Sequence, residues 1–192
     1  MPKIVENEQI YRAIMQVVSE RGYAGATTKQ MADAANVSEV TLFRKYGSKV
    51  QLVKQAIASI VDRTDFSTSA QYTGDIHADL LRVLQAYQNS AVKHGNFVSA
   101  LFLEMSRHPE LVDTIDEPLN IFLAIGELIA RYQDDGQLKK GHPMHTVAVL
   151  LGPLMYTAMM QRAIPIAQLL QLDLSNYVKD FLNGYQTDPG RK

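Results

Sequence analysis

Residues 27–49 read TTKQMADAANVSEVTLFRKYGSK, and this stretch decides the fold. Thr27 stands three residues before Gln30, which is the spacing of a capping box at the start of a helix. Asn36 suits a tight turn because asparagine tolerates a left-handed backbone. Ser38 is a favourable N-cap for a following helix. The stretch therefore predicts two short helices joined by a turn.

The predicted second helix, residues 38–46, has an inner and an outer side. Leu42 and Tyr46 are four residues apart and form one inward stripe. The outer side is then left with Glu39, Val40, Thr41, Arg44 and Lys45. A helix-turn-helix of this kind places its second helix in the major groove of DNA. The pattern favours a DNA-binding protein.

Two further helices complete the predicted N-terminal domain. Apolar residues at 10, 13, 14, 17 and 18 indicate an amphipathic helix that Gly22 ends. Apolar residues between 52 and 60 indicate another helix over 48–62. We expect residues 1–62 to form a helical domain around a small core.

The stretch GYAGATTKQMADAANVSEVTLFRKYGSKVQLV (22–53) resembles the N-terminal domain of the TetR family of bacterial transcriptional regulators. The resemblance covers about 50 residues and is specific, because spacing and residue types agree together. It rests on Gly22–Tyr23, Thr27–Thr28, Met31–Ala32, Asn36–Val37–Ser38, Thr41–Leu42–Phe43, Tyr46 and Ser48–Lys49–Val50. Asn36 replaces the usual turn glycine, Val40 stands where a small residue or proline is common, and Phe43 replaces a tyrosine that often reaches a phosphate.

The predicted helix-turn-helix supplies the candidate DNA contacts. Arg44, Thr41 and Glu39 are the candidates for reading bases, since arginine favours the O6/N7 edge of guanine. Phosphate contacts that set the register are expected from Thr27, Thr28, Lys45 and Lys49. The full predicted DNA-binding set is Thr27, Thr28, Ser38, Glu39, Val40, Thr41, Phe43, Arg44, Lys45, Tyr46 and Lys49.

Composition and charge agree with a globular protein of this class. The chain has 192 residues, 46% hydrophobic and 20% charged, with no cysteine, which is compatible with a reducing cytoplasm. Its longest apolar stretch, 147–160, is too short to span a bilayer. The net charge is −1, yet no acidic residue interrupts the four basic ones from Arg44 to Lys54. Phosphate binding needs a local positive patch rather than a basic protein; a solvated basic helix face is the alternative.

The remainder reads as all-α. A polar linker is expected at 63–75, an effector-binding and dimerisation domain at 76–186, and a flexible tail at 187–192. Helices are predicted over 76–93, 96–107, 118–134, 144–162 and 174–184. Gly95 is expected to end the first of these helices. No strand alternation and no internal repeat stand out.

The C-terminal part is rich in methionine and aromatic residues, which suit varied apolar ligands. The resemblance implies that this domain holds a small-molecule effector. The candidate pocket wall is Tyr87, Phe102, Met105, Phe122, Met155 and Met159. Ordinary core packing is the alternative for each of these residues.

Two apolar stripes mark the last two long helices. One comprises Val147, Leu150, Leu151, Leu154 and Ala158, and the other Leu174, Tyr177, Val178, Phe181 and Leu182. The resemblance implies that such helices form a four-helix interface in a homodimer, whereas the alternative is a monomeric core.

Catalytic and metal-binding signals are weak. His142 and His145, like Glu104 and His108, have spacings that suit two metal ligands, but no third ligand is evident, so no metal or other cofactor is expected. No nucleophile elbow, phosphate loop or cofactor fingerprint occurs.

The favoured interpretation is a dimeric repressor that an apolar or aromatic effector releases from operator DNA. An all-α small-molecule-binding protein or enzyme is the alternative. His77, His94 and His108 would then supply the titratable groups of its site.

Overall fold

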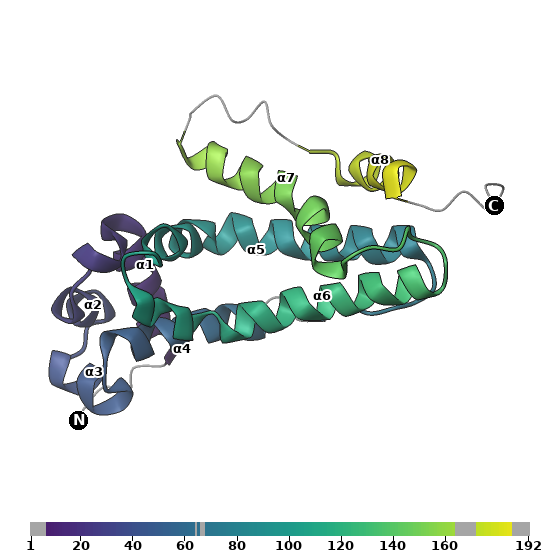
Figure 1. The fold of residues 1–192 in the computed structure, drawn as a ribbon. Coiled ribbons are helices and arrows are strands. Elements are labelled where there is room, and N and C mark those ends of the chain that lie inside the picture. Colours follow the sequence, from purple (N-terminus) through teal and green to yellow (C-terminus); the bar gives the residue numbers. More distant parts are fainter. Residues whose placement is uncertain (1–6, 64, 66–67, 164–171, 186–192) are drawn as a thin grey trace. The chain divides into compact units, whose positions relative to one another are not determined.

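The computed structural model describes residues 7–63, 65, 68–163 and 172–185. The elements are α1 (Asn7–Gly25), α2 (Thr28–Ala35), α3 (Glu39–Tyr46), α4 (Lys49–Arg63), α5 (Ile76–Glu104), the 3₁₀ helix η1 (Pro109–Thr114), α6 (Asp116–Asp134), α7 (Pro143–Ala163) and α8 (Leu174–Tyr185) (Figure 1). The predicted all-α class is confirmed. The predicted tail, and residues 64, 66 and 67 of the predicted linker, lie outside the described residues. Of the helices described, none is long and apolar enough to cross a membrane.

The chain divides into two compact units. The first comprises Met1–Arg63 and His94–Pro118, and the second Thr64–Lys93 and Leu119–Lys192. The helix α5 supplies its first part to the second unit and its last turns to the first unit. The boundaries drawn from sequence at 62 and 76 stay a prediction.

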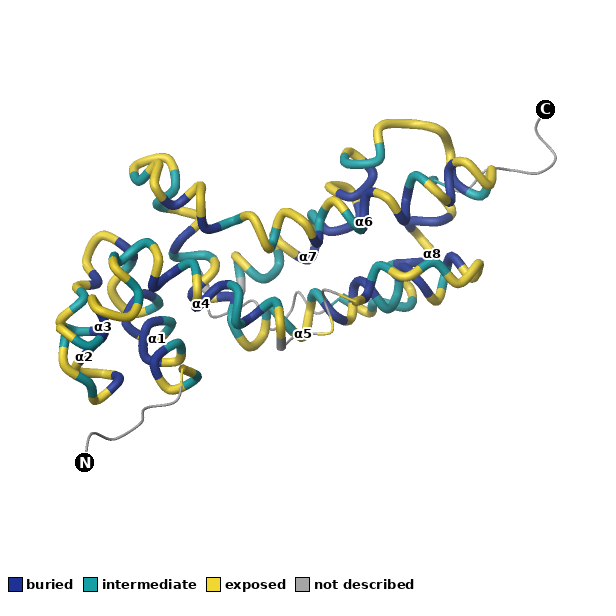
Figure 2. The backbone as a smooth tube through the Cα atoms, turned by 90° about the horizontal axis from the view of Figure 1, so that it is seen from below, coloured by how far each residue is buried: buried dark blue, intermediate teal, exposed yellow. Residues whose placement is uncertain are grey.

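The core of the first unit collects the inward faces of α1 to α4. Ile14, Val18, Met31, Leu42 and Val53 are fully buried there. Buried and exposed residues alternate along these helices (Figure 2), as amphipathic helices around a small core require. The same core also takes in Phe97, Leu101 and Leu111 from outside the first 63 residues.

The prediction that Gly95 ends a helix is wrong. The structure has one helix from Ile76 to Glu104, with Gly95 buried inside it. A glycine in a helix interior costs only about 1 kcal/mol. Burial of Phe97 and Leu101, each 2% exposed, offsets that cost, since one such side chain contributes about 1.5–3 kcal/mol.

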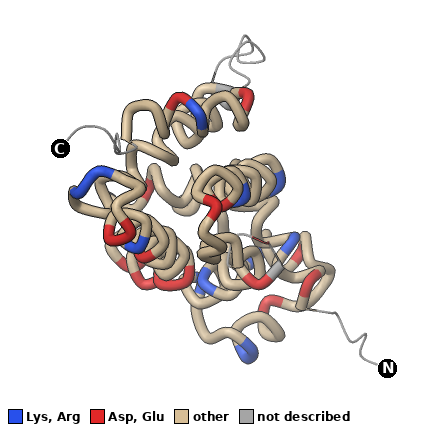
Figure 3. Tube along the Cα trace, turned by 90° about the vertical axis from the view of Figure 1, so that its right-hand side faces the viewer, with Lys and Arg blue, Asp and Glu red and all other residues tan. Residues whose placement is uncertain are grey.

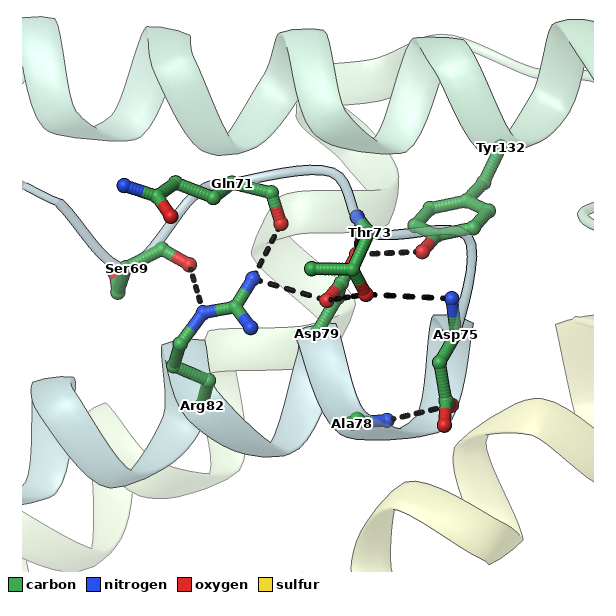
Figure 4. A network of polar contacts seen from close by, with 8 residues as sticks. All are labelled: Ser69, Gln71, Thr73, Asp75, Ala78, Asp79, Arg82 and Tyr132. Atoms are coloured by element: carbon green, nitrogen blue, oxygen red, sulfur yellow. Dashed lines mark hydrogen bonds and ion pairs between the residues drawn. The ribbon is translucent and has the colours of Figure 1, made fainter.

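A buried carboxylate fastens the start of the second unit (Figure 4). The side chain of Asp79 is fully buried and accepts hydrogen bonds from the Thr73 N–H at 2.7 Å and the Tyr132 hydroxyl at 2.6 Å. Arg82 pairs with the same carboxylate at 2.9 Å and also donates to the Ser69 carbonyl at 3.0 Å. Burial would raise the pKa of Asp79, but the hydrogen bonds from Tyr132, Thr73 and Arg82 outweigh it and lower that pKa. The segment 69–73 is thus held on α5 and α6.

Candidate nucleic-acid interface

The turn between α2 and α3 forms as the sequence predicts. The Thr27 hydroxyl accepts from the Gln30 N–H at 3.2 Å, and the Thr27 N–H donates to the Gln30 side chain at 3.0 Å, which completes the capping box. Asn36 is left-handed, with φ 57° and ψ 44°. Ser38 caps α3 by accepting from the Thr41 N–H at 3.1 Å. These local predictions are confirmed.

The outer face of α3 is well exposed to solvent. Leu42 is fully buried, whereas Val40 is 75% exposed and Phe43 is 49% exposed. Arg44 and Lys45 are also exposed. Tyr46 is half-buried and packs against the core, with its ring 6.1 Å from that of Tyr11. The helix therefore presents residues of both apolar and basic character to solvent.

Four of the residues predicted to contact DNA already hydrogen-bond to one another within the protein. The Thr28 hydroxyl donates to the Glu39 carboxylate at 2.5 Å, which joins α2 to the first turn of α3. The Thr41 hydroxyl lies 2.8 Å from the Ser38 hydroxyl. The first contact ties α3 to α2, and both contacts reduce the hydrogen-bonding capacity that these side chains have left for another molecule.

The basic residues of this region differ in their surroundings. Basic and acidic residues are interspersed along the described trace (Figure 3), so local exposure decides which cations are available. Lys45 donates to the Asn7 side chain from an exposed position. Lys49, in contrast, donates to the Tyr23 carbonyl and lies 4.1 Å from the centre of the Tyr23 ring. Burial lowers the pKa of Lys49, although Glu104 and Glu110 oppose that effect.

Sequence reasoning missed the cluster that lies behind Lys49. Gly22 adopts φ 69° and ψ 169°, which kinks α1. The Glu104 carboxylate accepts from the Ala24 N–H at 2.6 Å, just beyond the kink. His108 lies 3.7 Å from Glu104 and 3.2 Å from Glu110. The contact between Ala24 and Glu104 joins residues 80 positions apart in the sequence. The one local signal was Gly22, because a glycine can adopt a backbone conformation that other residues avoid.

The predicted pocket residues are distributed over both units. Phe102 and Met105 belong to the first unit, where Met105 packs partly buried against the core and Phe102 is 67% exposed. The other four, Tyr87, Phe122, Met155 and Met159, belong to the second unit. Met155 and Met159 are exposed on α7, and Tyr87 and Phe122 are half-buried. The assignment of these six residues to an effector site stays a prediction.

Of the ten residues in the two apolar stripes predicted for a dimer seam, seven are buried within a single chain and Ala158, Leu174 and Tyr177 are partly exposed, so the seam stays a prediction. Val147, Leu150, Leu151 and Leu154 are at most 5% exposed, and Val178, Phe181 and Leu182 are at most 7% exposed, so a single chain already buries them. The periodicity was correct, but it marks the face that packs inside the second unit. Among the described side chains of α7, the exposed large hydrophobic ones are Val149, Met155, Tyr156 and Met159.

His142 and His145 form the other pair whose spacing suits metal ligands. The rings of His142 and His145 lie 5.1 Å apart. Within the described residues, no group of three or more histidine, cysteine or carboxylate side chains is placed to hold a metal ion.

Comparison with known proteins identifies the domain that contains this helix-turn-helix. Residues 10–56 match the sequence model of the family described as bacterial regulatory proteins, tetR family. This match identifies residues 10–56 as an N-terminal domain of the TetR type. The match begins in α1 and ends in α4, so it covers the capping box, the Asn36 turn and the whole of α3.

Similar proteins extend the comparison beyond the matched domain. The chain is 31% identical over 111 residues to YvkB of Bacillus subtilis, named as an uncharacterized HTH-type transcriptional regulator, with 58% of each chain covered. The TetR family transcriptional regulator PfmR from Thermus thermophilus superposes with a TM-score of 0.74 at 14% identity, covering 95% of this chain and 98% of that one. A transcriptional regulator from Rhodococcus sp. Rha1 gives 0.71 at 17% identity, covering 96% and 100%.

These comparisons reach different parts of the chain. The chain spans only about half the length of the curated relatives it matches, from 52% to 58%. The two solved structures cover nearly the whole chain, but at identities below 25% they establish the fold alone.

Proposed function

We propose that this protein is a sequence-specific DNA-binding transcriptional regulator that inserts α3 into the major groove. The observation that supports this most is the fixed geometry of α3. Its N-cap and its hydrogen bond to α2 orient it on the domain, while its outer face remains exposed. A helix held in this way can place side chains against base edges with little loss of freedom on binding.

The candidate contacts follow from exposure. Arg44 is the principal base-reading residue, because its guanidinium can donate two hydrogen bonds to guanine O6 and N7. Lys45 is the principal phosphate contact because its side chain is exposed, although it also donates to Asn7. Thr27 and Thr28 are secondary because their hydroxyls already have partners, and no contribution is expected from Lys49, whose ammonium is held at Tyr23. Repression is the expected outcome, since a protein bound at a promoter blocks polymerase without any further contact surface.

We propose further that the active form is a homodimer. The exposed apolar residues of α7 support this, because Val149, Met155, Tyr156 and Met159 cover more than one turn of one helix. A helix that is apolar on several sides is usually covered on all of them. A second copy would cover this face by two-fold symmetry, and a two-fold dimer fits a near-palindromic operator.

The proposed signal is an apolar or aromatic small molecule bound in the second unit. The methionine and aromatic content of α5, α6 and α7 supports this class of ligand. Such an effector releases DNA if it binds better to a conformer in which the two α3 helices are wrongly spaced.

The experiment that tests DNA binding is selection of a binding site from a random duplex library, followed by titration. In Arg44→Ala, we expect a loss of about 1–3 kcal/mol on the selected site and relaxed preference at one base pair. Lys179→Ala is the matched control, because it removes the same charge from an exposed position in the second unit. Equal losses in both variants would contradict the assignment of α3.

A further inference from the structure

Exposed apolar side chains are unevenly distributed over the first unit. Among residues 7–63, the large hydrophobic side chains that are exposed are Val40 at 75% and Phe43 at 49%. Both lie on α3. Scattered single apolar residues on a surface need no explanation. Two that are three residues apart on the helix proposed to enter DNA form one continuous apolar patch.

The position of Val40 on α3 is the outermost one. Val40 precedes the fully buried Leu42 by two residues, which places it on the opposite side of a helix with 3.6 residues per turn. Arg44 follows Val40 by four residues and therefore lies on the same face. A groove that accepts Arg44 on a guanine edge must then accommodate the Val40 methyl groups as well.

The polar alternatives for base reading on α3 are weakened by their internal contacts. The Glu39 carboxylate accepts from Thr28, and the Thr41 hydroxyl lies 2.8 Å from the Ser38 hydroxyl. With these groups engaged, the outer face presents mainly methyl, phenyl and guanidinium groups. In the major groove, the apolar group that distinguishes one base from the others is the C5-methyl of thymine.

From these contacts we infer that Val40 is a specificity-determining residue that reads a thymine methyl group in each operator half-site, next to the base pair contacted by Arg44. This inference rests on the proposed function. Phe43 borders the same patch and shields the contact from water. The half-site is therefore expected to contain a T·A pair whose identity depends on the methyl group itself.

The test removes that methyl group without changing base pairing. In the selected binding site, each thymine is replaced in turn by deoxyuracil, and binding of the 192-residue protein is titrated. Loss of one buried methyl group is expected to weaken binding about fourfold at one position per half-site. In Val40→Ser, which removes both methyl groups from a side chain that is 75% exposed, the thymine-to-deoxyuracil ratio should fall to about one.

Lys45→Ala serves as the comparison variant. It should weaken binding to all sequences while leaving the thymine-to-deoxyuracil ratio unchanged, because a phosphate contact is insensitive to the methyl group. The inference is overturned if no thymine shows the effect although a specific site is bound, or if the effect persists in Val40→Ser. If the library yields no preferred sequence, the proposed function fails, and the inference fails with it.

Discussion

Replacement of Gly22 by alanine tests the most specific contact in the first unit. Gly22 has φ 69° and ψ 169°, a backbone region that is essentially confined to glycine. A Cβ atom at this position would lie 2.2 Å from Oε1 of Glu104. The same carboxylate accepts from the Ala24 N–H at 2.6 Å through its other oxygen. The substitution therefore strains the backbone and displaces the carboxylate together.

The magnitude follows from these two effects. An unfavourable backbone region costs about 1–3 kcal/mol. Loss of a hydrogen bond to a charged acceptor costs about 1.5–3 kcal/mol. The lower entropy of the unfolded alanine chain returns about 0.4–1 kcal/mol. We expect Gly22→Ala to lower the free energy of unfolding by about 2–5 kcal/mol.

Two other glycines separate the contributions. Gly47 has φ 78°, but no atom beyond its chain neighbours lies within 4 Å of the position that a Cβ would occupy, so Gly47→Ala should cost backbone strain alone. Gly25 has no positive φ and only an ordinary contact with Arg21 at 3.5 Å, so Gly25→Ala should change stability by at most about 1 kcal/mol.

Thermal and urea unfolding of the three variants rank the losses in the free energy of unfolding. A loss of 1 kcal/mol lowers Tm by about 2–4 °C in a protein of this size. The cost of Gly22→Ala should shrink toward that of Gly47→Ala when Glu104 is also alanine, because the clash and the hydrogen bond are then absent. The reasoning is refuted if Gly22→Ala costs no more than Gly47→Ala, or if its cost is the same with and without Glu104.

Three further changes test the other features of the two units. Lys49→Ala should lower thermal stability while leaving the salt dependence of DNA binding unchanged, since the Lys49 ammonium is held at Tyr23; a slope that falls by about one would show that it binds phosphate instead. Tyr156→Glu should give folded monomers in sedimentation experiments because it places a carboxylate in the proposed seam, whereas Val92→Glu, at an 80% exposed site on α5, should remain dimeric. Asp79→Asn should cost about 3–5 kcal/mol at pH 7 in urea unfolding. Because folding lowers the Asp79 pKa, that stabilisation is present above about pH 4 and lost as the pH falls further, so a difference that persists undiminished at pH 2 would contradict it.

The helix-turn-helix could be predicted because its determinants are local. Thr27 and Gln30 are three residues apart, and Asn36 and Ser38 set the turn and the next cap without help from the rest of the chain. Each of these choices agrees with the final structure, so short-range reasoning was sufficient. The exposed outer face of α3 followed from the burial of Leu42 by helix periodicity alone.

Features that depend on distant packing could not be predicted in the same way. Gly95 looks like a helix end, yet burial of Phe97 in the core of the first unit keeps α5 continuous. The contact between Glu104 and Ala24 joins residues 80 positions apart, and no local pattern announces it. The apolar residues of α7 lie on several sides of the helix, so sequence could not decide which side packs inside the chain and which side is exposed.

The basic run from Arg44 to Lys54 shows why a count of charges overstates electrostatic binding. Lys49 is held at Tyr23, and Lys54 pairs with Asp116 at 2.7 Å, so Arg44 and Lys45 are the exposed pair at the end of α3. If Lys45 reaches a phosphate in each subunit while Arg44 contacts a base, a dimer neutralises about two phosphates with these residues, and they contribute about −1.8 to the logarithmic salt slope. That is a modest electrostatic contribution for a protein with a net charge of −1. Tight operator binding would then depend on contacts with base edges, which makes the methyl groups of Val40 and the guanidinium of Arg44 more important than the number of basic residues suggests.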